Sequence, residues 1–234
     1  MRKFDYSFLK RISVPADIMN YATSIYEMKA KAELRRSDFA EVFSAMESVA
    51  KIQSVKSSNA IERIITTDKR IRDIVNKSTA PQGHNELEIA GYRDALDLIH
   101  GSYSEIPFSE KSILELHRIL LQPSGDDLAG RYKTEDNFII ETDREGVRSV
   151  RFTTVPASET AFAMEQLILA YHAAYLEAEI NPLMLITCVI LDLLCIHPFR
   201  NVNGRMSRLL SLLLMYKSGF NAGKYVSIEE QINT

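Results

Sequence analysis

Apolar residues recur at helical spacing along most of this chain, and turn or capping residues separate the periodic segments. Ser37 and Ser109 suit helix N-caps, and Asn85 with Glu88 resembles a capping box. The pattern predicts a mainly helical, all-α fold. The expected helices are Pro15–Arg35, Ser37–Lys56, Asp68–Asn76, Asn85–His100, Ser109–Leu121, Ser158–Glu177, Pro182–Ile196 and Gly204–Lys217.

One segment interrupts the helical pattern. Phe138–Thr142 and Val147–Phe152 are short and rich in β-forming residues, and Asp143, Arg144, Glu145 and Gly146 between them favour a turn. The sequence therefore predicts one β-hairpin in an otherwise helical protein. Locally, this hairpin could equally be a surface decoration.

The break at residues 80–83, Ala-Pro-Gln-Gly, suggests an organisation in two parts. We expect an N-terminal helical region over 1–80 and a core domain over 81–234. The tail from Gly219 ends in what resembles the start of a helix. We therefore expect that the natural protein continues with at least one more helix.

Composition narrows the class of partner. The net charge of −3 gives no basic footprint for nucleic acid. The most apolar run, Leu183–Ile196, is shorter than the roughly 18 residues that a membrane span needs. Cys188 and Cys195 lie about two helical turns apart, too far for a disulfide, and fit a reducing, cytoplasmic compartment. Whether the chain forms a homo-oligomer stays open.

Candidate chemistry gathers where the apolar helix ends and the next helix begins. His197 lies at the junction, and Asn203–Gly204 supply a turn with an approachable backbone. Arg205 and Arg208, three residues apart, share one helix face. Unpaired N–H groups at a helix N-terminus, with two arginines beside them, favour phosphate binding. A neighbouring histidine can accept a proton from an attacking hydroxyl. Each feature alone has an ordinary structural explanation, and only the combination indicates a phosphate site.

The segment HPFRNVNGRMSR resembles the motif H-x-F-x-[DE]-G-N-G-R-x-x-R of the Fic (filamentation induced by cAMP) family. The resemblance implies a helical Fic fold and a protein adenylyltransferase, which uses ATP and Mg²⁺ to attach AMP to a hydroxyl of a target protein. It makes His197 the general base and Arg208 the clamp on the γ-phosphate. The implied nucleotide- and phosphate-binding residues are Asn201, Val202, Asn203, Gly204, Arg205 and Arg208.

Two motif positions depart from the family pattern. Asn201 stands where a carboxylate usually holds Mg²⁺, and an uncharged amide is a poorer ligand for a hard cation. Val202 stands where glycine is usual, and its branched side chain restricts the backbone. We expect at most weak Mg²⁺ binding through Asn201. A catalytically weakened nucleotide-binding pseudoenzyme or regulator is therefore the alternative to an active transferase.

A second element resembles the inhibitory helix of one Fic class, [ST]-x-x-x-E-[GN]. Ser58 and Glu62 fit this pattern, and Arg63 replaces the usual glycine or asparagine. The resemblance implies that Glu62 pairs with Arg208 and denies the γ-phosphate its partner. We expect a partly buried contact of roughly 2.7–3.2 Å between the two side chains. The same glutamate could instead position a water for removal of AMP from a modified target.

The predicted hairpin corresponds by resemblance to the family's flap, which receives an extended segment of the target by strand addition. Ile139, Ile140 and Val150 are the flap residues that we expect to contact the target. The partners implied are thus ATP and a target protein that the sequence does not identify.

Overall fold

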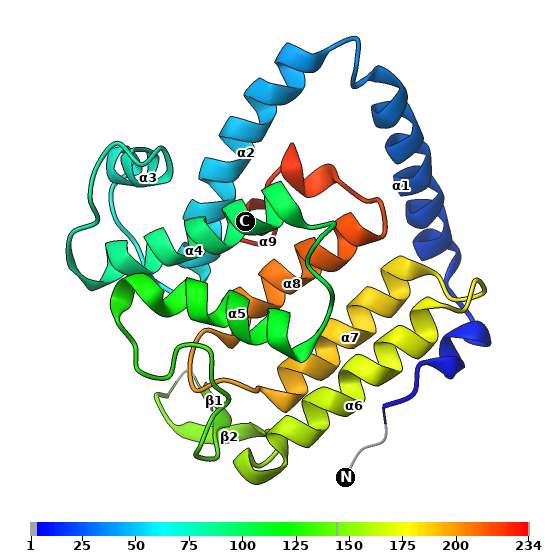
Figure 1. Ribbon diagram of the computed structural model, residues 1–234. Helices are drawn as coiled ribbons and strands as arrows, with labels where there is room; N and C mark the ends of the chain where they lie inside the picture. The colour runs from blue at the N-terminus through cyan, green and yellow to red at the C-terminus, as the bar shows by residue number, and fades with distance from the viewer. Residues whose placement is uncertain (1–3, 144, 234) are drawn as a thin grey trace.

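The computed structural model describes residues 4–143 and 145–233. Helices dominate this part of the chain, and one two-stranded antiparallel sheet accompanies them (Figure 1). The helices are α1 (Ala16–Arg35), α2 (Ala40–Ile61), α3 (Asp68–Val75), α4 (Gly83–Ser102), α5 (Glu110–Leu121), α6 (Ala157–Tyr175), α7 (Pro182–Ile196), α8 (Asn203–Lys217) and α9 (Ile228–Ile232). Within the described residues, short 3₁₀ turns cover Ser7–Lys10, Gln122–Ser124 and Ala222–Lys224.

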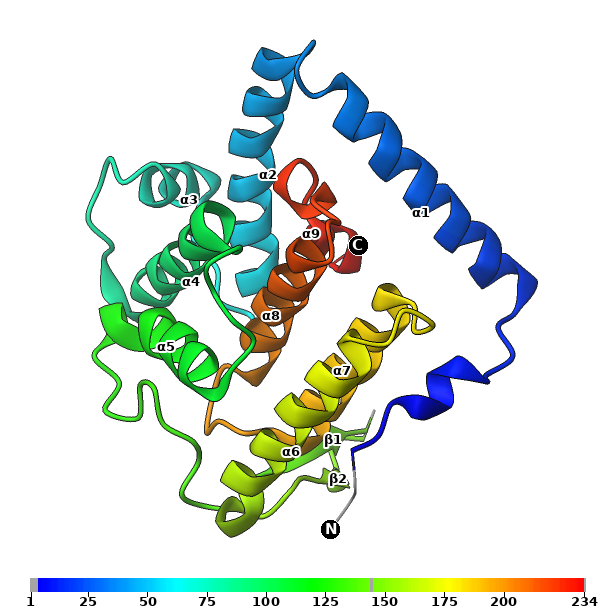
Figure 2. The same ribbon diagram turned by 45° about the vertical axis from the view of Figure 1, so that its right-hand side comes forward.

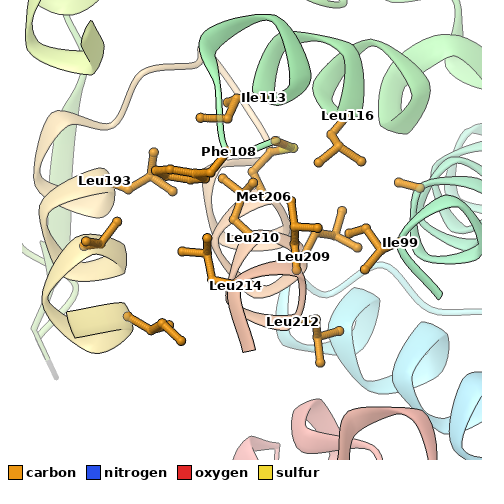
Figure 3. Close-up of a cluster of buried hydrophobic side chains, with 14 of the residues drawn as sticks. Ile99, Phe108, Ile113, Leu116, Leu193, Met206, Leu209, Leu210, Leu212 and Leu214 are labelled. Atoms are coloured by element: carbon orange, nitrogen blue, oxygen red, sulfur yellow. The ribbon is translucent and has the colours of Figure 1, made fainter. Parts of the chain in front are cut away.

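Helix α8 is the centre of the fold. Leucines and Met206 point from it into the main core, where they meet side chains of α4, α5 and α7 (Figure 3). Helix α7 buries Leu185, Val189 and Ile196 at helical spacing, which explains how a short apolar helix packs on one side of α8. The loop between α7 and α8 therefore starts and ends on rigid, buried elements.

Helix α1 differs from the others because none of its residues is buried. It stands apart from the body in both views (Figures 1 and 2). The ring of Tyr26 meets that of Phe220 edge-on at 5.2 Å, so α1 touches the segment that follows α8. Helix α2 instead runs inward, and its last turns contain the buried residues Ser54, Val55, Ser57, Ser58 and Asn59.

The hairpin is confirmed as β1 (Phe138–Thr142) paired with β2 (Arg148–Thr153). Arg144, which the sequence places in the turn, lies outside the described residues. Ile140 pairs with Val150 and both are exposed, whereas Ile139 is partly buried. Ile140 and Val150, two of the three residues predicted to contact the target, thus form one exposed cross-strand pair that a partner can reach.

Several predicted helix ends were wrong. Ser37 does not cap α2, which begins at Ala40 and continues past Lys56 to Ile61. The predicted capping box at Asn85 is also wrong, because α4 begins at Gly83 and Glu86 accepts a hydrogen bond of 2.7 Å from the Gln82 N–H. The asparagine side chain instead donates to the Ile65 carbonyl.

The predicted cap at Ser109 is confirmed, because its hydroxyl accepts from the Ser112 N–H.

None of the described helices is long and apolar enough to cross a membrane. The division of the chain at residue 80 stays a prediction.

Candidate functional site

His197 closes α7 in the left-handed region, with φ 52° and ψ 61°, and its N–H donates to the Leu193 carbonyl at 2.9 Å. Burial lowers the pKa of its imidazole, the Leu194 backbone partly offsets this, and the nearby Lys133 ammonium lowers it further. The ring is therefore neutral near pH 7. A neutral imidazole has a lone pair with which to accept a proton.

The loop after His197 is held by Asn203. The Asn203 Oδ1 accepts from the Phe199 N–H at 3.0 Å, and its Nδ2 donates to the Phe199 carbonyl at 2.7 Å. The Phe199 ring is buried and stacks on His117 at 3.9 Å. Because its side chain is committed to the loop, Asn203 can offer a phosphate only its backbone N–H.

Val202 is the N-cap of α8 and has φ 61° and ψ 14°. The backbone therefore adopts the left-handed conformation that glycine would supply without strain, at a cost of about 1–2 kcal/mol for an L-residue. Val202 also packs against the core with part of its side chain. Asn201 beside it is exposed. The valine thus occupies a left-handed position at the start of α8 where glycine would be unstrained.

Arg205 is buried and faces α4 and α2. Its Nη2 donates to Glu88 Oε2 at 2.5 Å, and its Nη1 reaches Asn59 Oδ1 at 3.4 Å. The other carboxylate oxygen of Glu88 lies 2.5 Å from Nε2 of the exposed His84. Sequence interpretation did not assign Glu88 a partner in the motif, because 117 residues separate it from Arg205.

Arg208 bonds to the end of α2. Its Nε donates to Ser58 Oγ at 2.8 Å, and its Nη2 donates to the Ser58 carbonyl at 2.8 Å and to Glu62 Oε1 at 2.9 Å. The predicted contact is confirmed, within the expected distance. The arginine side chain is 14% exposed and the glutamate side chain 37% exposed, so burial of the pair is unequal.

Gly204 makes the approach of Glu62 possible. A Cβ at this position would overlap Oε1 of Glu62. The motif glycine therefore accommodates the carboxylate at the N-terminus of α8. There the carboxylate faces the positive end of the helix dipole, where a phosphate would also be stabilised.

An open cavity of about 690 Å³ lies beside the loop. Glu62, Glu88, Asn201, Val202 and Arg205 line it, together with the turn at 124–127. His197 is not part of its lining. Glu62 and the motif loop thus line the same cavity, which is large enough for polar groups of a nucleotide.

The described residues do not fit a preformed Mg²⁺ site. No group of three His, Cys, Asp or Glu side chains among them could hold a metal ion. Mg²⁺ in phosphate-transfer sites is usually held by one or two carboxylates and by the substrate phosphates. The motif position that would supply the carboxylate is occupied by Asn201.

Three further residues connect the hairpin to the motif loop and were missed by sequence interpretation: Lys133, Asn137 and Thr154. The Lys133 Nζ donates to both other side chains and to the Ile196 carbonyl. A lysine in a polar stretch has no local pattern that marks it as buried. Only its place between two distant segments reveals its partners.

Known proteins resemble this chain in sequence and in fold. Residues 107–215 match the Fic/DOC family. The chain resembles the solved Fic family protein of Desulfovibrio desulfuricans with a TM-score of 0.76 and 19% identity, over 95% of this chain and 64% of that one. It also resembles a Fic domain-containing signalling protein of Bacteroides thetaiotaomicron with a TM-score of 0.70 and 22% identity, over 83% and 73% of the two chains. Residues 107–215 therefore match a Fic domain, and the described residues have the Fic helical fold.

Among curated proteins, the chain is similar to the protein adenylyltransferase Fic of Nematostella vectensis. The two are 28% identical over 181 residues. The match covers 73% of this chain but only 39% of that protein. The similarity supports a Fic-type transferase in general, of the kind that uses ATP and a divalent metal.

Proposed function

We propose that this protein is an auto-inhibited adenylyltransferase that transfers AMP from ATP to a hydroxyl side chain of a target protein. The observation that carries the proposal is the pair of Glu62 with Arg208 at the N-terminus of α8. A carboxylate there neutralises the arginine that the Fic motif reserves for the γ-phosphate. His197, the general base in this proposal, ends the preceding helix.

In the proposed reaction, the target hydroxyl oxygen attacks the α-phosphorus and forms a new P–O bond. The bond from the α-phosphorus to the oxygen that bridges it to the β-phosphate breaks, and pyrophosphate leaves with the electron pair. His197 accepts the hydroxyl proton on its neutral imidazole, whose lowered pKa keeps it available as a base. The first N–H groups of α8 and Arg205 stabilise charge on the phosphates.

Glu62 restrains this reaction by competing with phosphate. Its carboxylate occupies one donor of Arg208 and adds negative charge at the helix N-terminus. ATP must displace it before the γ-phosphate can bind Arg208. Removal of the carboxylate should therefore release both the arginine and the space next to Gly204.

The alternative is a nucleotide-binding regulator without transferase activity. Asn201 and Val202 favour it, because the first lacks a charge for Mg²⁺ and the second strains the loop. In this alternative, the protein retains the phosphate-binding loop and the inhibitory contact of Glu62 with Arg208, but it does not transfer AMP. It therefore predicts ATP binding without labelling.

Incubation with ATP labelled at the α-phosphate, in Mg²⁺ or Mn²⁺, separates the two. We expect Glu62→Gly to label itself at least about tenfold more than the unchanged protein, and Glu62→Gly with His197→Ala not to label. Labelling that survives His197→Ala would remove the base from the proposal. ATP binding by Glu62→Gly without any labelling would favour the regulator.

A further inference from the structure

Lys133 lies in the segment that leads into β1 and is only 4% exposed. Its Nζ donates to Asn137 Oδ1 at 2.8 Å, Thr154 Oγ1 at 2.9 Å and the Ile196 carbonyl at 3.2 Å. Asn137 directly precedes β1, and Thr154 directly follows β2. One ammonium group therefore joins both ends of the hairpin to the residue before the motif histidine.

The same segment bonds to the rest of the motif loop. The backbone N–H of Lys133 donates to the Pro198 carbonyl at 2.9 Å. The Asn137 Nδ2 donates to the Phe199 carbonyl at 3.0 Å and lies 3.4 Å from that of His197. The four consecutive carbonyls of residues 196–199 are thus all bonded to Lys133 or Asn137. The base of the hairpin and the motif loop form one hydrogen-bonded unit.

Burying an ammonium group costs free energy, because the charge loses its hydration. Burial lowers the pKa of Lys133 to about 8, and Asp136 opposes the shift. No ion pair of Lys133 occurs within 4.0 Å among residues 4–143 and 145–233. The three N–H donors are nevertheless all used, by three acceptors from three segments. A neutral side chain of similar length has no such set of donors.

We propose that Lys133 is a positioning residue, which fixes the hairpin relative to His197 so that a target bound to the hairpin presents its hydroxyl to the imidazole. The inference rests on the proposed transferase function. Strand addition places a target only relative to the hairpin, and His197 belongs to another element. The hydrogen bonds of Lys133 fix the hairpin relative to the segment that carries His197. A displacement of about 1 Å at a reacting group can cost roughly a hundredfold in rate.

Variants in the Glu62→Gly background test the proposal. Lys133→Met removes the donors and keeps the length. Thr154→Val removes one acceptor, and Thr154→Ser is its matched control because it keeps the hydroxyl. We expect Lys133→Met and Thr154→Val to lower kcat for labelling about tenfold or more, with KM for ATP within about twofold. Thr154→Ser should stay close to the parent.

Unchanged kcat in both Lys133→Met and Thr154→Val would overturn the inference. An equal loss of rate in Thr154→Ser and Thr154→Val would also overturn it, because the hydroxyl would then be irrelevant. A loss of ATP affinity as large as the loss of rate would mark a general collapse of the loop instead of a positioning role.

Amide hydrogen exchange on the same variants gives a readout that does not need activity. We expect faster exchange over residues 137–154 and 196–199 in Thr154→Val, with α8 beyond Met206 as slow as in the parent. Unchanged exchange in both segments would refute the link between hairpin and loop. If the parent does not label, the transferase proposal fails, and the exchange result still decides whether Lys133 joins the two segments.

Discussion

Glu62 and Arg208 are 146 positions apart in the sequence, and a hydrogen bond of 2.9 Å joins their side chains. Ser58 adds two bonds to the same guanidinium, so the last turn of α2 holds Arg208 at three points. Gly204 leaves the space that the carboxylate needs. The end of α2 and the start of α8 are therefore complementary, both in hydrogen bonding and in the space left at Gly204.

The end of α2 gives a first prediction. Arg63 has φ 61°, and the N–H groups of Arg63 and Ile64 donate to the carbonyls of Ala60 and Asn59. This is a Schellman ending, whose left-handed residue is usually glycine. Because the Arg63 side chain is exposed, Arg63→Gly should raise the free energy of unfolding by about 0.5–1 kcal/mol in urea denaturation. Arg63→Ala keeps the Cβ and should give no such gain; equal gains from both would show that strain is not the cause.

The motif loop gives a second prediction. Asn201→Asp adds a charged oxygen where the Fic motif has one, so ATP affinity should rise several-fold in Mg²⁺. In EDTA the added charge repels phosphate, and affinity should fall instead. Calorimetry of the variant with and without Mg²⁺ measures both. Asn233→Asp, at the exposed C-cap of α9, is the control for added charge and should change neither. A gain that does not depend on Mg²⁺ would place Asn201 away from the metal.

The buried His117 and the partly buried His100 predict acid sensitivity. Burial lowers the pKa of His117 and of His100 to about 4, from about 6.5 in the unfolded chain. Between these values the unfolded state binds more protons, so stability is full above pH 6.5 and is lost as the pH falls toward 4. The Arg70 guanidinium lowers the pKa of Glu86 to about 2, so Glu86 adds a further loss as the pH falls from about 4.5 to 2.

His117→Gln isolates one of these groups. Glutamine can still accept from the Gly130 N–H, which now donates to His117 Nδ1 at 3.0 Å, and it does not titrate. Denaturation at pH 7 and pH 4.5 should show a smaller drop in unfolding free energy than in the unchanged protein, by about 1–3 kcal/mol. Identical drops in both proteins would mean that His117 titrates normally in the folded state.

Much of the fold follows from local pattern. The predicted helix Pro182–Ile196 has the observed bounds, because proline suits the first helical position and the apolar run defines the rest. Helix ends were harder to predict where contacts with distant residues determine them. Helix α2 continues past Lys56 because Ser57, Ser58 and Asn59 are buried against other segments, which their polar sequence does not indicate.

Some residues of the candidate site were also predictable from local sequence, and others were not. His197 and the two motif arginines can be found from local sequence, because a helix end, a turn and a helix start are adjacent in the chain. The contact of Glu62 was predictable only through resemblance to Fic proteins. Lys133 and Glu88 were missed, because their partners Ile196 and Arg205 lie 63 and 117 residues away. Long-range contacts of single polar residues leave no periodicity in a sequence.

Removal of the Glu62 carboxylate should cost the apo protein little. The glutamate side chain is 37% exposed. It lies between the C-terminal end of α2, whose dipole disfavours a negative charge, and the N-terminal end of α8, whose dipole favours one, so the two effects oppose each other. Arg208 also keeps both bonds to Ser58. We therefore expect Glu62→Gly to lower the unfolding free energy by no more than about 1 kcal/mol in urea denaturation. A larger loss would show that the pair holds the fold together.

The affinity for ATP of Glu62→Gly, measured by calorimetry beside the unchanged protein and Glu62→Gln, tests the brake most directly. Loss of the carboxylate frees one donor of Arg208 and the space next to Gly204, so ATP should bind about tenfold more tightly. Glu62→Gln keeps the bulk without the charge and should fall between the two. Equal ATP affinity in all three proteins would contradict an inhibitory role for Glu62.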